Sequence, residues 1–119
     1  MVDMGRMILN NGGTEQNTNP SSNWQGARGA SGGLALLAAD SRFEPELLDA
    51  AFNRVRTYIN QSVGIHPETR GWVTEGLGYT YYPYGLFVGP FAMAMAHLQG
   101  RDLRDETAIS EVYRALLTA

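Results

Sequence analysis

The residues best suited to chemistry lie in one glycine-rich segment, residues 71–85. Its aromatic and acidic side chains are Trp72, Glu75, Tyr79, Tyr81, Tyr82 and Tyr84. Aromatic rings present flat apolar faces to the C–H groups of a sugar, and phenol hydroxyls both donate and accept hydrogen bonds. The segment therefore fits a surface that binds a carbohydrate, with Glu75 orienting a polar group of the ligand. The same residues also fit a structural role, in which the tyrosines anchor the loop and Glu75 tethers a backbone amide.

Four helices are predicted to position this segment, over residues 27–39, 45–62, 85–99 and from Asp105 or Thr107 to the C-terminus. In the second, apolar residues recur at steps of three and four, Pro45 occupies the first turn and Gly64 follows the end. The third is apolar nearly all round, as in an inner helix, and Pro90 either kinks it or marks its first turn. The fold class is therefore all-α, with two antiparallel helical hairpins.

Two loops separate these elements, at residues 10–23 and 65–84. A polar connection of about a dozen residues is uncommon inside a compact domain unless it is functional or disordered, and we favour a functional loop. Residues 1–119 are expected to form one helical unit. Because the third helix is apolar on nearly every side, three short neighbours cover it poorly, and the unit is expected to be part of something larger.

Composition narrows the classes of ligand. The net charge of −3 gives no basic field for nucleic acid, and no segment is long and apolar enough to span a membrane, so we expect a soluble chain. The absence of cysteine excludes a disulfide framework or a thiolate metal site. No metal site and no cofactor are predicted. The first residues do not read as a signal peptide.

A family resemblance rests on Asn23-Trp24 ahead of a glycine-rich helix, and on Thr74-Glu75-Gly76 followed by Tyr79-Thr80-Tyr81-Tyr82. These motifs, over about residues 17–100, resemble the helical toroid of heparinase II/III-like and alginate-lyase-like polysaccharide lyases. In these families an Asn-Trp or Asn-His element begins one inner helix, and a Glu-Gly loop with spaced tyrosines begins another. The resemblance implies part of an (α/α) toroid, an acidic polysaccharide or oligosaccharide as substrate, and an extracellular or periplasmic location.

It also implies β-elimination, in which the carboxylate next to the reacting carbon is neutralised and a tyrosine moves a proton. Carried over by position, Asn23 contacts the substrate carboxylate and Tyr79 or Tyr82 is the catalytic acid or base. Since the ordinary pKa of tyrosine is about 10, a base also needs a nearby cation, for which Arg28 and Arg70 are candidates. The predicted substrate-binding residues are Trp24, Arg28, Trp72, Glu75, Tyr81 and Tyr84.

Two other functions compete with the lyase. Residues 25–28, which follow Asn23-Trp24, include no histidine, although such lyases generally use one, so a non-catalytic helical module for carbohydrate binding or protein assembly is the main alternative. Convergence of Asn23, Tyr79 and Tyr82 on one cleft would favour the enzyme. An exposed apolar patch on the third or fourth helix would favour assembly, including self-association or a neighbouring domain. A glycoside hydrolase ranks last because it needs two facing carboxylates and only Glu75 is well placed.

Overall fold

The computed structural model describes residues 22–39, 45–64, 70–73, 76, 80 and 83–118 of the chain. These form the helices α3 (Asn23–Ala38), α4 (Pro45–Ser62), α6 (Gly89–Gln99) and α7 (Ile109–Thr118), with a π-helical turn η2 (Tyr84–Val88) and a 3₁₀ turn η3 (Leu103–Asp105). The described part contains isolated β-bridges but no strand, which confirms the all-α prediction. Within the same part, no helix is both long and apolar enough to cross a membrane.

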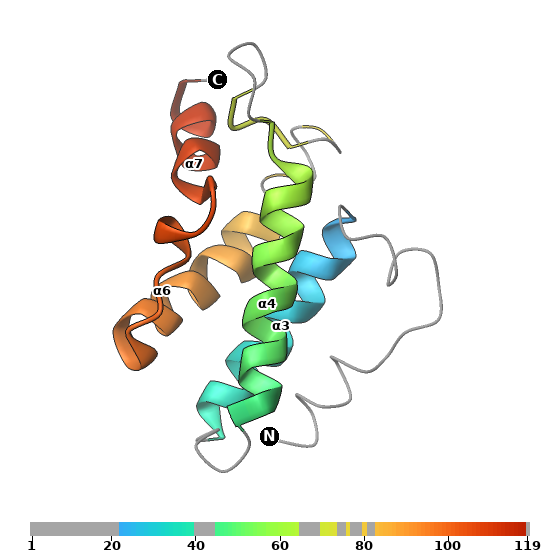
Figure 1. Ribbon diagram of the computed structural model, residues 1–119. Helices are drawn as coiled ribbons and strands as arrows, with labels where there is room; N and C mark the ends of the chain where they lie inside the picture. Colours follow the sequence, from blue (N-terminus) through green and yellow to red (C-terminus); the bar gives the residue numbers. More distant parts are fainter. Residues whose placement is uncertain are drawn as a thin grey trace.

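Helices α3 and α4 form a closely packed antiparallel hairpin (Figure 1). Glycines on α3 face the side chains of α4. A Cβ added to Gly26 would lie 2.5 Å from the ring of Tyr58, and one added to Gly29 would lie 2.9 Å from Val55 Cγ2. Because alanine would overlap its neighbours at both positions, the two helices approach more closely than larger residues would permit.

A third glycine of α3 lies against α6. A Cβ at Gly33 would overlap the ring of Phe91, which is fully buried on α6. Helix α3 therefore packs against both α4 and α6. The core that results is dominated by large side chains of these helices, with all of the following fully buried: Phe52, Tyr58, Ile59, Tyr84, Phe91 and Met95.

Local sequence signals explain the helix ends. Helix α3 begins one turn earlier than predicted because the Ser22 side chain caps it, accepting a hydrogen bond from the Trp24 N–H at 3.4 Å. Helix α4 has the predicted bounds. Of the two caps predicted for α7, Thr107 is the one that accepts the Ile109 N–H, at 3.3 Å.

Pro90 lies in the first turn of α6, so the predicted third helix is divided in two. The Gly89 N–H donates to the Tyr84 carbonyl five residues earlier, which makes residues 84–88 a π-turn. Since Pro90 has no N–H, it leaves the regular helical bond to Leu86 unmade. The proline thus marks the start of the α-helix. Just before it, the backbone hydrogen bonds change from a spacing of five residues to the α-helical spacing of four.

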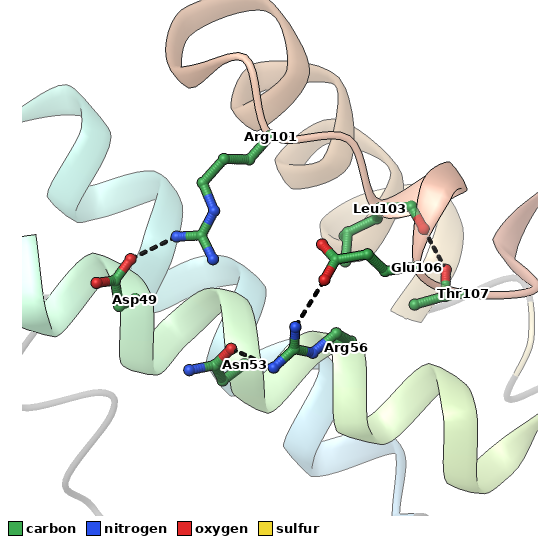
Figure 2. Close-up of polar contacts among 7 residues, drawn as sticks. All are labelled: Asp49, Asn53, Arg56, Arg101, Leu103, Glu106 and Thr107. Atoms are coloured by element: carbon green, nitrogen blue, oxygen red, sulfur yellow. Dashed lines mark hydrogen bonds and ion pairs between the residues drawn. The ribbon is translucent and has the colours of Figure 1, made fainter.

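Ion pairs connect α4 to the turn after α6 (Figure 2). Arg56 Nη1 donates to Glu106 Oε1 at 2.7 Å, and Arg101 pairs with Asp49. The Arg101 guanidinium also lies over the Phe52 ring, 4.0 Å from its centroid. Pairs this exposed stabilise a fold by less than about 1 kcal/mol each. Their main effect is to fix where the chain turns from α6 towards α7.

The close contact at Gly33 predicts that alanine there destabilises the protein. Gly33→Ala is expected to lower the free energy of unfolding by about 1–3 kcal/mol, because the added methyl displaces the buried Phe91 ring. Gly85→Ala is the control, since a Cβ at Gly85 has no neighbour within 4 Å. It should be neutral or stabilising by up to about 1 kcal/mol. Urea denaturation followed by circular dichroism measures both, and equal effects would contradict the packing described for α3.

Candidate functional site

Five of the predicted site residues lie in the described part of the chain: Asn23, Trp24, Arg28, Trp72 and Tyr84. The other four, Glu75, Tyr79, Tyr81 and Tyr82, lie outside it. The convergence of Asn23, Tyr79 and Tyr82 on one cleft therefore stays a prediction. The five described residues come from the start of α3, the segment after α4 and the π-turn.

The first turns of α3 present one aromatic and one basic side chain. Asn23 is nearly buried, with 8% of its surface exposed, whereas Trp24 is 46% exposed. Arg28 follows Trp24 by one helical turn, and its guanidinium carbon lies 5.0 Å from the centre of the indole ring. This distance is typical of a cation–π contact, which fixes the two side chains relative to each other.

A second arginine approaches this pair from α4. Arg54 Nε donates to Gln25 Oε1 at 2.5 Å, which ties the two helices together. The pKa of the Arg54 guanidinium is lowered below its ordinary value. The larger cause is burial, and the second is the positive charge of Arg28. The two guanidinium groups are therefore close enough to repel each other. Arg28, Arg54, Gln25 and Trp24 are called the arginine site below.

The arginine site contains an unsatisfied donor. Arg28 Nε is buried and has no hydrogen-bond partner among the described residues. A buried donor without an acceptor costs about 1–3 kcal/mol. An anion at this position would satisfy the Arg28 donor, so the site is suited to a carboxylate or a sulfate.

Trp72 lies at the same end of the hairpin. Its carbonyl accepts the Gly64 N–H at 2.9 Å, and an antiparallel bridge joins Val63 to Val73. Gly71 has a positive φ of 82° and lies against the Glu111 carbonyl, where a side chain would overlap the backbone of α7. The indole of Trp72 is held in this way with 41% of its surface exposed. Both tryptophans of the chain are thus partly exposed, Trp24 at the start of α3 and Trp72 in the segment after the end of α4.

The sequence placed Tyr84 among the substrate-binding residues. In the structure its side chain is fully buried, so it has no surface with which to contact a sugar. Its ring lies 5.8 Å from that of Tyr58 and 6.3 Å from that of Tyr113, measured between ring centroids. The Tyr113 hydroxyl donates to the Tyr84 carbonyl at 3.0 Å. Tyr84 is therefore a loop anchor, the structural role that the sequence left open.

Sequence reasoning missed Gln25 and Arg54 as site residues. The helical pattern of residues 45–62 placed Arg54 outside the apolar face, as it does for any solvated arginine. Gln25 precedes Arg28 by three positions, so the two lie on one side of α3. That spacing was the available signal, but only the packing of α4 on α3 brings Arg54 to it.

A groove lies between α6 and the η3–α7 segment, apart from the arginine site. Its volume is about 720 Å³, and its walls include Gly89, Ala92, Met93, Ala96 and Tyr113. His97, which follows an apolar helical sequence, also lines the groove and is exposed. Among the residues that the structure describes, no three His, Asp or Glu side chains are grouped to hold a metal ion.

An exposed apolar patch of the kind predicted for an assembly module is present on α6 and the π-turn before it. The exposed fractions are 63% for Leu86, 75% for Met93 and 61% for Leu98. On α7, Leu117 is 88% exposed. Single exposed apolar residues are ordinary on a protein surface, and of these Met93 lines the groove.

Comparisons with protein-family models, with characterised proteins and with solved structures found no match to this chain. The resemblance to polysaccharide lyases therefore rests on the motif residues alone.

Buried tyrosines predict instability at alkaline pH. The pKa of Tyr84 is raised, mainly by burial and secondly by the nearby Tyr58. The Ser62 hydroxyl acts in the opposite direction but offsets only part of this rise. Burial also raises the pKa of Tyr113. Since both groups hold their protons more tightly in the folded protein, their stabilising contribution is complete below the unfolded pKa of about 10 and is lost as the pH rises above it.

Tyr84→Phe should therefore raise the pH at which the protein unfolds, while changing stability at pH 7 by no more than about 1 kcal/mol. Far-UV circular dichroism between neutral and strongly alkaline pH measures this midpoint. Tyr113→Phe is the comparison, because it loses the bond to the Tyr84 carbonyl and should cost about 1 kcal/mol at pH 7. An unchanged alkaline midpoint in Tyr84→Phe would show that another group controls the transition.

Proposed function

We propose that this chain binds an acidic, uronate-containing polysaccharide or oligosaccharide at the arginine site. The observation that carries the proposal is the approach of Arg28 and Arg54, from different helices, beside the exposed ring of Trp24. Guanidinium groups bind carboxylates in a bidentate manner, and an indole face stacks on sugar C–H groups. A uronate residue offers both features in one unit, a carboxylate and an apolar sugar face.

We further propose that this binding serves a polysaccharide lyase built on an (α/α) toroid, of which the chain supplies an arc. In β-elimination the carboxylate is neutralised, the adjacent carbon loses its proton and the glycosidic oxygen leaves. The arginine site supplies charge neutralisation, and Tyr79 or Tyr82 would move the proton. The tight α3–α4 pair and the packing of α6 on α3 are compatible with consecutive inner helices of such a toroid.

A protein-assembly module is the second candidate function, and the exposed apolar residues Leu86 and Met93 favour it. Assembly and carbohydrate binding use different surfaces, so one does not exclude the other.

Binding at the arginine site is expected to change the intrinsic tryptophan fluorescence. The chain has two tryptophans, and both are partly exposed at this end of the hairpin. Titration with oligomers of galacturonate, mannuronate or glucuronate should give a saturable signal that weakens as salt is added, and a neutral glucan of equal length should give none. Arg28→Gln should weaken affinity at least about tenfold, because a charged hydrogen bond is lost.

Arg114→Gln is the matched control for this titration. Arg114 is an exposed arginine of α7 that pairs with Glu111 at 3.3 Å. Its loss should leave the affinity within about twofold, since it removes the same net charge from a helix that carries none of the residues of the arginine site. Equal weakening by both substitutions, or no signal with any uronate, would refute a specific site at Arg28.

Catalysis is tested separately, by the ultraviolet absorbance of the unsaturated uronate that β-elimination produces. Tyr79→Phe or Tyr82→Phe should lower the rate about 10²–10⁴-fold, the usual contribution of a positioned acid or base, while leaving the fluorescence titration unchanged. Binding without any absorbance change, in a chain shown to be folded, would contradict the lyase and leave a non-catalytic carbohydrate-binding module.

A further inference from the structure

The groove between α6 and the η3–α7 segment is hollowed by small residues. Gly89, Ala92 and Ala96 recur at steps of three and four residues, which places them along one side of α6. None of them has a side chain larger than a methyl group, and the groove that they line has a volume of about 720 Å³. Sites for small molecules usually have volumes of about 300–1,000 Å³. The groove is therefore large enough for a small organic molecule.

The other walls of the groove are mainly apolar. Ile109 and Tyr113 contribute from α7, and Pro90 and Met93 contribute from α6. Met93 is 75% exposed, and its unbranched thioether side chain adapts readily to the shape of a neighbour. An apolar ligand in the groove would remove this side chain from water together with its own surface, which is favourable for both.

The groove is short because it is bounded at both ends. At the start of α6 the Tyr113 hydroxyl lies over Gly89, where an added Cβ would overlap it, and a hydrogen bond to a carbonyl of the π-turn holds it there. Beyond the last turn of α6, Asp102 and Arg104 line the other end. From Gly89 to His97 the α6 wall is about 12 Å long, at about 1.5 Å per residue. A helix of a partner protein needs a groove that is open at its ends, whereas a small molecule fits between these limits.

The charges that line the groove neutralise each other. Arg104 Nη2 lies 2.6 Å from Asp102 Oδ2, and Arg104 Nε donates to the same oxygen at 3.0 Å. This bidentate pair leaves neither an anionic nor a cationic ligand a free counter-charge. His97 and Ser110 add an imidazole and a hydroxyl to the lining, which are groups that hydrogen-bond an uncharged polar atom. The lining therefore favours an uncharged ligand.

We propose that this groove binds an uncharged, largely apolar small molecule of about two or three rings, with a hydrogen-bonding group towards His97 and Ser110. The proposal goes beyond carbohydrate binding and uses none of the residues of the arginine site. The two sites can therefore be tested in the same protein with different ligands.

The uncharged dye N-phenyl-1-naphthylamine is a suitable probe, because it consists of aromatic rings and fluoresces strongly only when it leaves water. Titration of the full chain should give a saturable rise in dye fluorescence, with a dissociation constant on the order of micromolar. The sulfonated analogue anilinonaphthalene sulfonate carries the same rings and a negative charge. It should bind at least about fivefold more weakly, because its charge would be buried without an unpaired cation.

Filling the groove should block the dye. Ala92→Phe and Ala96→Phe each place a ring in the space that the ligand occupies, and each should raise the dissociation constant at least about tenfold. Ala50→Phe is the matched control, because Ala50 is exposed on α4 and does not line the groove. It should leave the constant within about twofold. Circular dichroism checks that each variant is folded.

A second pair of variants leaves the packing of α6 untouched. Met93→Gln makes an exposed groove residue polar at nearly constant size, and it should weaken dye binding at least about threefold. Leu98→Gln is its control, since Leu98 is 61% exposed on the same helix but does not line the groove. It should leave the binding unchanged.

Absence of saturable dye binding would overturn the proposal, as would equal weakening by a groove variant and its control. Preferential binding of the sulfonated dye would overturn the assignment to an uncharged ligand. Arg28→Gln should leave the dye titration unchanged, so failure of carbohydrate binding and failure of this proposal are distinguishable.

Discussion

The arrangement of the helices depends on the glycines of α3. Gly26 and Gly29 let Tyr58 and Val55 of α4 approach the α3 backbone, and Gly33 does the same for Phe91 of α6. An α-helix with a Cβ at these positions would hold both neighbours further away and would leave voids around their side chains. Interiors are close-packed, so the loss would extend to every contact that the two helices share. Helix α3 thus sets the separation of α4 and α6, and through it the positions of the residues that they carry.

The arginine site is a consequence of this packing. Arg28 and Arg54 are 26 positions apart in sequence, yet the tight α3–α4 contact brings their charges within reach of each other, with the Gln25–Arg54 bond as the link. Burial and the neighbouring charge of Arg28 lower the pKa of the Arg54 guanidinium, and groups with perturbed pKa values cluster at functional sites. The exposed ring of Trp24 adds an apolar face beside the charges. These properties together motivate the proposal that the ligand is an acidic carbohydrate.

The groove on α6 has its origin in a different local constraint. Pro90 removes one helical hydrogen bond, and the π-turn over residues 84–88 absorbs the change of register. The same turn leaves the Tyr84 carbonyl able to accept both the Gly89 N–H and the Tyr113 hydroxyl, so α7 contacts the start of α6 through Tyr113. Further along α6, Ala92 and Ala96 line the groove. π-turns occur often at functional positions, and this one lies at the junction of the loop, the groove and the core.

Periodicity and caps, which are properties of short segments, determined the all-α class and the bounds of α4. Trp24 and Arg28 were named as candidates from the motif resemblance, and the structure shows that their side chains form a cation–π contact. Tertiary structure alone decided that Tyr84 is buried, that His97 is exposed and that Arg54 joins Arg28. Burial and contact between distant segments depend on which helix faces meet, and the spacing of residues within one segment does not contain that information. The amino-acid sequence thus specified the helices and one side of the arginine site, and the packing of α4 on the glycines of α3 supplied the other side.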